Sequence, residues 1–285
     1  MTYFREISTV FAYELACVFR GIRSLSMLAV YLLGTGLVGV IFVQAYLKVL
    51  EKAARMAPGS QEQGQELKSW LIHEAIKDDP ATADSLAATP APVIFFFWFA
   101  LMAIPLFTAL TGFDVLSGEL QHRGIRYLSM RVRRGSLLMG KLAVQVLVAV
   151  CITAAADAGL FLYAAWRIPG FEAGIGLSAM ARFWVCSIPY VATYVTLTAL
   201  VSAWIRIPIL ALMLVFIVLF ILWILSLLAV WLPSMAFLGW GLPSHYHWGL
   251  YSVTPSILAR SLAAYTGFSL LFGGLAWFSL ARRDL

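Results

Sequence analysis

Charged residues are scarce in this chain of 285 residues. Asp, Glu, Lys and Arg make up only 12% of it, whereas hydrophobic residues make up 62%. A soluble domain usually carries about 25% charged residues. The apolar residues also fall in blocks long enough to cross a bilayer, which takes about 20 residues. The composition therefore excludes a soluble enzyme and predicts an integral membrane protein.

Cysteine is also rare. Cys17, Cys151 and Cys186 lie far apart, and no CxxC spacing occurs, so neither a disulfide framework nor a zinc site is indicated. The first 26 residues carry several charges and have no short apolar core before a cleavage site, which argues against a cleaved signal. The formal net charge of +6 is typical of basic loops on the cytoplasmic side of a membrane protein. We expect no nucleic-acid binding, because no soluble domain is present to provide it.

Residues 1–26 show the pattern of an amphipathic helix. Apolar residues from Phe4 to Leu25 recur in steps of three and four, while Arg5, Arg20 and Arg23 lie mostly off that stripe. The pattern predicts a helix in the membrane interface on the cytoplasmic side. The alternative, a soluble helix packed on a partner, stays open.

Residues 27–285 are predicted to form one transmembrane domain of six helices. The expected spans are Met27–Leu47, Val93–Leu116, Leu138–Ala165, Ala181–Ala203, Ile209–Leu232 and Ser261–Leu280. The fold class is therefore an all-α membrane protein with an N-terminal amphipathic interfacial helix. The polar loop 48–92 is broken by Pro58-Gly59 and Pro80 into two short helices.

Charge decides which side the loops face. With six spans, both termini, the loop 117–137 and Arg206 lie on one side, and that side carries 12 of the 20 basic residues when Lys141 is included. Basic residues stay on the cytoplasmic side. We therefore expect cytoplasmic termini in a cell inner membrane, with loops 48–92 and 233–258 facing outward.

The segment from Asp114 to Lys141 is the densest signal in the chain. It contains five arginines within twelve residues, which are Arg123, Arg126, Arg131, Arg133 and Arg134. Guanidinium groups pair well with carboxylates on a partner. The same charges also suit cytoplasmic topology and lipid headgroups. Composition alone leaves both interpretations open.

This segment resembles the permeases of the type-2 family of ATP-binding-cassette (ABC) exporters. Their motif is an acidic residue, Ser-Gly-Glu, a Gly-containing short helix, and a basic residue before Gly-Lys. Here the corresponding residues are Asp114, Ser117-Gly118-Glu119, Gly124, Arg134 and Gly140-Lys141. Glu14-Leu15 with Arg20 in the N-terminal helix, and Phe278 followed by Arg282-Arg283-Asp284-Leu285, are similar to the family's two ends. One departure is Arg131, where many members have proline.

The resemblance implies a coupling helix, at about Ser117–Ser129, that docks on a separate ATPase subunit. Ile125 and Leu128 would supply apolar contacts, and Glu119, Arg123 and Arg126 polar ones, with Ser117, Gly118 and Gly124 shaping the helix and Arg206 making a smaller contact. It also implies two ATPase copies that bind ATP and magnesium, and a second permease copy, most simply a homodimer. This chain would then hold no cofactor, no metal and no catalytic residue.

The run Gly135 to Lys141 matches the GxxxxGK part of a phosphate-binding loop, but context argues against nucleotide binding. Leu142 stands where Ser or Thr binds magnesium, no strand precedes the run, and an apolar span follows. His245 and His247 are too few ligands for a metal site, so a structural role is favoured.

Polar residues inside spans mark a candidate translocation path. Asp157 is the only acid deep within a span, with Thr153 one turn before it, and Thr193 and Thr196 share a face of the fourth span. Such groups usually face a water-filled path or bond to a neighbouring helix, and both interpretations stay open.

Two other functions compete with an ABC exporter. An ATP-independent carrier would use Asp157 as a proton relay. A mechanotransmitting subunit would pass force through residues 48–92 to an extracytoplasmic protein. The substrate is not readable from the sequence.

Overall fold

Each element of the computed structural model is helical over the residues that it describes, which are 3–56, 60–76, 79–121 and 132–282. The first elements are α1 (Tyr3–Arg20), α2 (Ile22–Met56), α3 (Ser60–Ala75), α4 (Pro80–Ala88), α5 (Ala91–Gly112) and α6 (Ser117–Gln121). The later elements are α8 (Arg134–Arg167), α9 (Ala173–Trp204), α10 (Pro208–Trp231), the 3-10 helices η1 (Pro233–Gly241), η2 (Pro243–Tyr246) and η3 (Trp248–Leu250), and α11 (Pro255–Ala281). No strand occurs among these residues.

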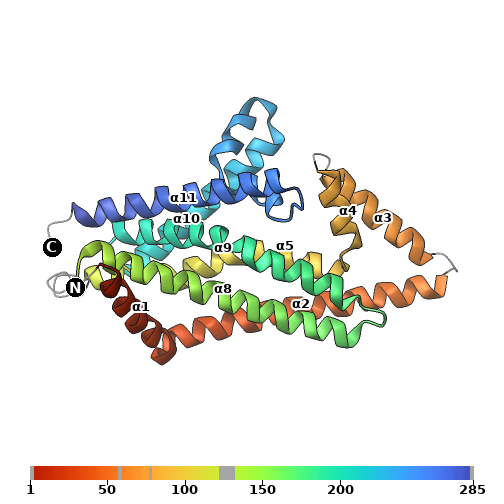
Figure 1. The fold of residues 1–285 in the computed structure, drawn as a ribbon, viewed down its shortest axis with the longest axis horizontal. Coiled ribbons are helices and arrows are strands. Elements are labelled where there is room, and N and C mark those ends of the chain that lie inside the picture. Colours follow the sequence, from red (N-terminus) through yellow and green to blue (C-terminus); the bar gives the residue numbers. More distant parts are fainter. Residues whose placement is uncertain (1–2, 57–59, 77–78, 122–131, 283–285) are drawn as a thin grey trace.

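Six of the helices are long and apolar enough to cross a membrane. They are α2, α5 with α6, α8, α9, α10 and α11. This confirms the predicted fold class of an all-α protein with six spans. They form an elongated bundle with the two chain ends at one end and α3 and α4 at the other (Figure 1). We call these the terminal end and the loop end.

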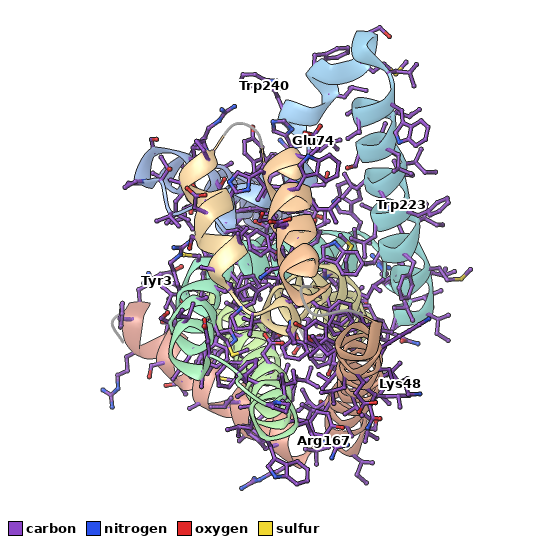
Figure 2. All side chains as sticks on the ribbon, turned by 90° about the vertical axis from the view of Figure 1, so that its right-hand side faces the viewer. Tyr3, Lys48, Glu74, Arg167, Trp223 and Trp240 are labelled. Carbon is purple, nitrogen blue, oxygen red and sulfur yellow. The ribbon has the colours of Figure 1, made fainter. Side chains whose placement is uncertain are left out.

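Helix α9 forms the centre of the bundle. It packs against α11, α5, α8 and α10, and every residue from Thr193 to Ala203 is buried. In α10, by contrast, only Ala211 and Val215 are buried. Viewed from the loop end, α10 stands apart from the other spans, with Trp223 pointing away from them (Figure 2). The bundle therefore has its core around α9, whereas much of the apolar surface of α10 is exposed.

Pro105 lies inside α5, and a proline within a helix usually kinks or breaks it. Proline has no N–H, so the carbonyl four residues earlier, that of Leu101, loses its helical partner. Tyr190 of α9 donates its OH to this carbonyl at 2.6 Å. In an apolar bundle every backbone carbonyl needs such a partner. The hydroxyl of Tyr190 therefore replaces the backbone hydrogen bond that Pro105 cannot make. Helix α5 remains one helix from Ala91 to Gly112.

The first helix ends earlier than the sequence pattern suggests. The amphipathic stripe extends to Leu25, but α1 ends at Arg20 and α2 begins at Ile22. The break falls at Gly21, and glycine is among the weakest helix formers. Residues 22–26 consequently belong to the helix of the first span, and α1 turns away to cross α8 (Figure 1).

Candidate coupling site

Three charged side chains from three helices meet at the terminal end. Lys141 of α8 has only 6% of its side chain exposed. Its Nζ lies 2.6 Å from Glu14 Oε1 of α1 and 2.7 Å from Glu119 Oε1 of α6. A buried ammonium requires opposite charge beside it, and the two carboxylates provide it. We call these three residues the coupling cluster, because they join the N-terminal helix, the short helix after the second span and the start of the third span.

The coupling cluster carries more negative than positive charge, because two carboxylates face one ammonium. Within the described residues, Glu119 Oε2 is buried and accepts no hydrogen bond. A buried polar atom without a partner costs about 1–3 kcal/mol. The charge balance of the cluster therefore favours one further donor at this oxygen.

Ser202, near the end of α9, fixes the bend between α5 and α6. Its Oγ donates to the carbonyl of Phe113 at 2.8 Å and accepts from the backbone N–H groups of Leu116 and Ser117, at 3.2 and 3.0 Å. Helix ends have unpaired backbone groups that need such partners. Ser202 carries no signal in the sequence, because a serine in an apolar helix usually bonds to its own helix. Its hydroxyl instead holds α6 against α9.

The start of α8 also contacts both ends of the chain. Glu6 Oε2 of α1 accepts a hydrogen bond from Ser136 Oγ at 2.9 Å. The guanidinium of Arg134 donates to the carbonyls of Leu280 and Ala281, at 3.2 and 3.0 Å. Basic side chains commonly satisfy the last carbonyls of a helix in this way. The motif residue Arg134 therefore connects the third span to the end of the last one.

Helix α1 crosses α8 at Gly140. A Cβ atom at this position would lie 2.6 Å from Val10 Cγ1 and 3.3 Å from the carbonyl oxygen of Ile7. Only glycine permits so close an approach. Gly140 and Lys141 of the family motif thus have separate roles, since the first admits α1 and the second bonds to it.

The predicted coupling residues are only partly described by the structure. Ser117, Gly118 and Glu119 form the start of α6, with Ser117 fully buried and Glu119 directed toward Lys141. Arg206 is exposed in the turn between α9 and α10. Arg123, Gly124, Ile125, Arg126 and Leu128 lie outside the described residues. Their roles stay predictions, as does the predicted contact of Glu119 with an ATPase.

Thr153 and Asp157 of the candidate path lie on α8 and face different neighbours. Thr153 Oγ1 is 3.3 Å from the OH of Tyr31 in α2. The indole Nε1 of Trp184 in α9 donates to Asp157 Oδ2, also at 3.3 Å. Both side chains are buried within the chain, at 3% and 4% exposure. These contacts fit the interpretation that they bond to neighbouring helices.

Thr193 and Thr196 lie on another side of α9. Thr193 Oγ1 donates to the carbonyl of Tyr265 in α11 at 2.8 Å, and Thr196 Oγ1 donates to the carbonyl of Ala192 at the same distance. Thr196 also borders an apolar groove of about 840 Å³ between α8, α9 and α11. The structure thus places Thr193 against α11 and Thr196 beside this groove, whereas the two α8 residues contact α2 and α9. Their part in a translocation path stays a prediction.

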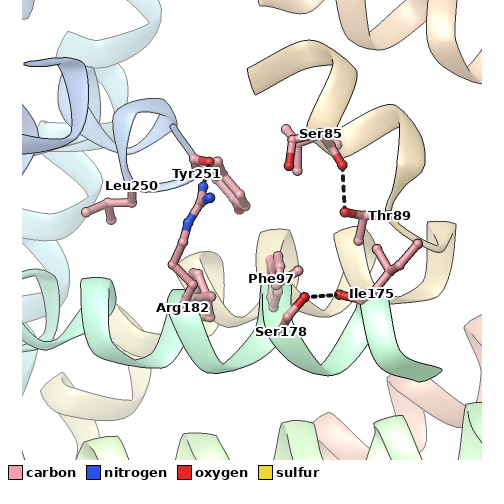
Figure 3. Close-up of a pocket in the computed structure, with 11 residues that line it drawn as sticks. Ser85, Thr89, Phe97, Ile175, Ser178, Arg182, Leu250 and Tyr251 are labelled. Carbon is pink, nitrogen blue, oxygen red and sulfur yellow. Dashed lines mark hydrogen bonds between the residues drawn. The ribbon is translucent and has the colours of Figure 1, made fainter. Parts of the chain in front are cut away.

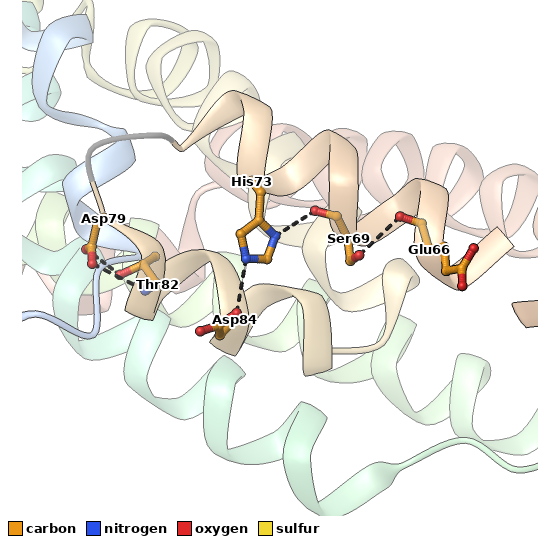
Figure 4. Close-up of polar contacts among 6 residues, drawn as sticks. All are labelled: Glu66, Ser69, His73, Asp79, Thr82 and Asp84. Atoms are coloured by element: carbon orange, nitrogen blue, oxygen red, sulfur yellow. Dashed lines mark hydrogen bonds and ion pairs between the residues drawn. The ribbon is translucent and has the colours of Figure 1, made fainter. Parts of the chain in front are cut away.

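A second polar cluster holds the loop end together. Asp79 caps the N-terminus of α4 by accepting from the backbone N–H of Thr82 at 3.3 Å (Figure 4). It also accepts from Ser252 Oγ, and from Thr254 Oγ1 at 2.8 Å, both in the segment that leads into α11. Burial by itself raises the pKa of this carboxyl, but the hydrogen bonds from Ser252, Thr82 and Thr254 outweigh it and lower the pKa to about 2. We call these four residues the loop-end clasp.

The two histidines before α11 have structural contacts. The ring of His245 stacks on Trp240 with 6.4 Å between centroids, and His247 Nδ1 bonds to the carbonyl of Ser244. Burial lowers the pKa of His247. Over the part of the chain that the structure describes, no three His, Cys, Asp or Glu side chains group as metal ligands.

Comparison with known proteins identifies the family. The sequence pattern of the ABC-2 family transporter proteins matches residues 18–248, well over half of the chain and including Glu119 and Lys141. A comparison with curated proteins gives no match. Members of this family are membrane components of ABC transporters and are generally not catalytic. With its six apolar helices, the chain is a multi-pass membrane protein and belongs to the ABC-2 transporter family.

Proposed function

We propose that this chain is the permease subunit of an ABC exporter, driven by separate ATPase subunits that bind ATP and magnesium. The observation that carries the proposal is the coupling cluster. Glu119 lies in the Ser-Gly-Glu motif, and Lys141 bonds it to both α8 and α1. A force applied to the loop that follows α6 therefore acts on three helices at once.

The proposal gives the bundle an orientation. The terminal end faces the cytoplasm of a cell inner membrane, because that side carries most of the basic residues. The coupling helix spans about residues 117–129 and begins with α6. Arg206 provides a second ATPase contact, supported by its exposure and by the packing of α6 against α9 and α10.

Movement passes from the coupling helix through fixed contacts. Ser202 bonds α6 to α9, Lys141 bonds it to α8, and Arg134 bonds α8 to the end of α11. Helices joined by buried polar contacts shift together as rigid elements. Closure of the ATPase dimer then changes the tilt of these spans, while the groove beside Thr196 and the buried Asp157 are candidate parts of the path.

The working unit contains two permease copies, most simply identical ones. Gly34 and Gly36 of α2 would place an added Cβ in open space, and only two residues of α10 are buried within the chain. Small residues and unpaired apolar faces allow close helix packing in membranes. In contrast, the space beside Gly39 is occupied within the chain, because an added Cβ would overlap the side chain of Leu160.

A second candidate function is mechanotransmission to an extracytoplasmic partner protein. The loop-end clasp favours it, because Asp79 bonds the α3–α4 pair to the start of α11. Motion of the last span would therefore reach the loop 48–92. The carrier alternative has less support, since Asp157 is held by Trp184.

The test is copurification of the tagged chain from its native membrane, with mass spectrometry and an ATPase assay. We expect a stoichiometric ABC ATPase. Arg126→Glu should release it, and Arg206→Glu should weaken its binding, because both place an acid on the proposed docking face. Arg167→Glu is the matched control, an exposed arginine at the opposite end of the spans, and should retain the ATPase.

The outcomes separate the candidates. Recovery of the chain without any ATPase would overturn the permease assignment and favour the carrier, which Asp157→Asn would then test by loss of transport. An ATPase together with a stoichiometric extracytoplasmic protein, lost on truncation of α3 and α4, would favour mechanotransmission.

A further inference from the structure

A polar pocket lies at the loop end, apart from the coupling cluster. Its volume is about 230 Å³, and it opens between α4, the start of α9 and η3 (Figure 3). Phe97, Phe183 and Tyr251 form an aromatic wall, with 4.5 Å between the ring centroids of Phe97 and Phe183. All three rings are nearly buried. The pocket is therefore a preformed space with one apolar side.

The other side of the pocket is polar, because Arg182 and several hydroxyl side chains line it. The guanidinium of Arg182 extends along the pocket and donates one hydrogen bond to the carbonyl of Tyr251 (Figure 3). Among the described residues, no carboxylate forms an ion pair with it. Ser85 of α4, Thr89 directly after that helix and Ser178 of α9 also line the pocket. Most donors of the guanidinium thus remain for a ligand.

A second cation adjoins this pocket. Lys68 of α3 donates to the carbonyls of Ala87 and Thr89, at 2.8 and 2.5 Å, where α4 ends. Burial lowers the pKa of Lys68, while Glu172 opposes this. The pocket lining itself contains no aspartate or glutamate among the described residues. Among the described lining residues, Arg182 therefore carries the formal charge, and a guanidinium binds phosphate or carboxylate in a bidentate manner.

We propose that this pocket binds the anionic group of a small amphiphile, a phosphate or carboxylate, with the adjoining apolar part against Phe97 and Tyr251. Ligand pockets usually have volumes of about 300–1,000 Å³, so 230 Å³ suits a head group with a short apolar portion. The inference deepens the proposed export function, on which it rests, by naming the chemical class of the substrate. The anion has two possible sources, a lipid headgroup or a free organic anion.

Binding can be measured on the purified chain in neutral detergent, without an ATPase. The probes are hexyl phosphate and hexanoate, with hexanol and hexyltrimethylammonium as controls for chain and charge. We expect both anions, and neither control, to bind by calorimetry and to raise the thermal midpoint. Arg182→Met should weaken hexyl phosphate binding at least tenfold, whereas Arg167→Met, at an exposed arginine outside the pocket, should not change it.

A second variant keeps the test valid if Arg182→Met unfolds the chain. Ala179→Leu fills the pocket without removing the cation, and it should also abolish binding. Nanodiscs that contain phosphatidylglycerol, compared with phosphatidylcholine alone, identify the source, because a lipid headgroup would displace hexyl phosphate only in the first. Equal binding of hexanol, or binding unchanged in both variants, would overturn the proposal. That result leaves ATPase copurification intact, so failure here is distinct from failure of the permease assignment.

Discussion

At the scale of single residues, Lys141 is a buried cation that joins two carboxylates from two other helices. Lys141→Met removes the ammonium and leaves Glu14 and Glu119 close together without a counter-charge. Breaking a buried ion pair in this way costs about 3–5 kcal/mol. We expect a loss of stability at the lower end of this range, because the two glutamates keep 21% and 23% of their side chains exposed. Thermal denaturation in detergent should show a lower midpoint.

The control for this prediction is Lys48→Met, which removes an exposed lysine from the same bundle. It should leave the midpoint nearly unchanged. Adding Glu14→Gln and Glu119→Gln to Lys141→Met should recover part of the loss, because the unpaired carboxylates disappear. If Lys141→Met alone is as stable as the natural protein, the cluster does not hold these helices together.

Asp79 should make the stability of the chain depend on pH. Its pKa is about 2 in the folded chain, against an ordinary value near 3.8. A lowered pKa contributes stability that is present above about pH 4 and is lost as pH falls toward 2. The thermal midpoint of the natural protein should therefore fall more steeply over this range than that of Asp79→Asn.

Asp79→Ala should also destabilise the chain near neutral pH, by about 1–3 kcal/mol, because the hydroxyls of Ser252 and Thr254 lose their acceptor. Glu51→Ala is the control, since Glu51 is an exposed acid of α2 outside the loop-end clasp. Equal midpoints for the two variants would show that the loop-end clasp contributes no stability.

The residue scale also shows what sequence can and cannot predict. The motif identified Glu119 and Lys141 as family residues, but not their direct contact, because no helical period relates two residues on separate helices. The role of Glu14 in the same cluster depends on how α1 turns at Gly21. Ser202 had no signal, since its partners are backbone groups of a bend that only the packed structure defines.

At the scale of elements, the crossing of α1 over α8 depends on Gly140. Gly140→Leu should displace α1, because even a Cβ would lie 2.6 Å from Val10. The expected result is faster proteolysis within residues 3–20 and loss of ATP-driven activity in the complex. Gly159→Leu is a matched control on the same helix, where an added Cβ meets nothing within 4 Å. Similar behaviour of the two variants would contradict the role of this crossing.

The α3–α4 pair contains a second pH-sensitive contact. His73 Nε2 of α3 lies 3.0 Å from Asp84 Oδ1 of α4, and His73 Nδ1 lies 2.8 Å from the carbonyl of Ser69 (Figure 4). The Ser69 carbonyl and Asp84 raise the pKa of His73 above 6.5. A raised pKa contributes stability that is present below about pH 6.5 and is lost as pH rises above the folded value.

We therefore expect amide hydrogen exchange in α3 and α4 to increase, after correction for intrinsic rates, as the pH rises from below 6.5 to above the folded pKa of His73. His73→Gln should remove this dependence while leaving exchange in α9 unchanged. An identical pH dependence in the variant would assign the effect to another group.

The lengths of the apolar blocks predicted the number and order of the spans, because each block that crosses the bilayer must be about 20 residues long. The residues at which helices begin and end were harder to predict from the sequence. The apolar stripe extends through Gly21 to Leu25, although the helix breaks at Gly21. Helix α2 continues to Met56, beyond the expected end of the first span at Leu47. Side-chain periodicity reports a face, not the residue at which a helix stops.

At the scale of the whole molecule, the exposed surface of α10 is a candidate interface between two copies of the chain. A membrane helix that is apolar all round can face lipid, but two identical copies related by a twofold axis place the same residues opposite each other. Ile217, Phe220 and Trp223 are each at least half exposed in the single chain. We expect single cysteines at some of these positions to form crosslinked dimers in membranes, in a variant whose three natural cysteines are replaced.

The control for the crosslinking is Leu162→Cys, which places the thiol on an exposed position of α8 and tests whether crosslinking reflects exposure alone. Crosslinking at all positions alike, together with a monomer by native mass spectrometry, would contradict a homodimer built on α10. Crosslinks confined to one face of α10 would define the twofold axis of the dimer. Each copy would then present its own coupling cluster at the terminal end, where the proposed pair of ATPase subunits would act on both.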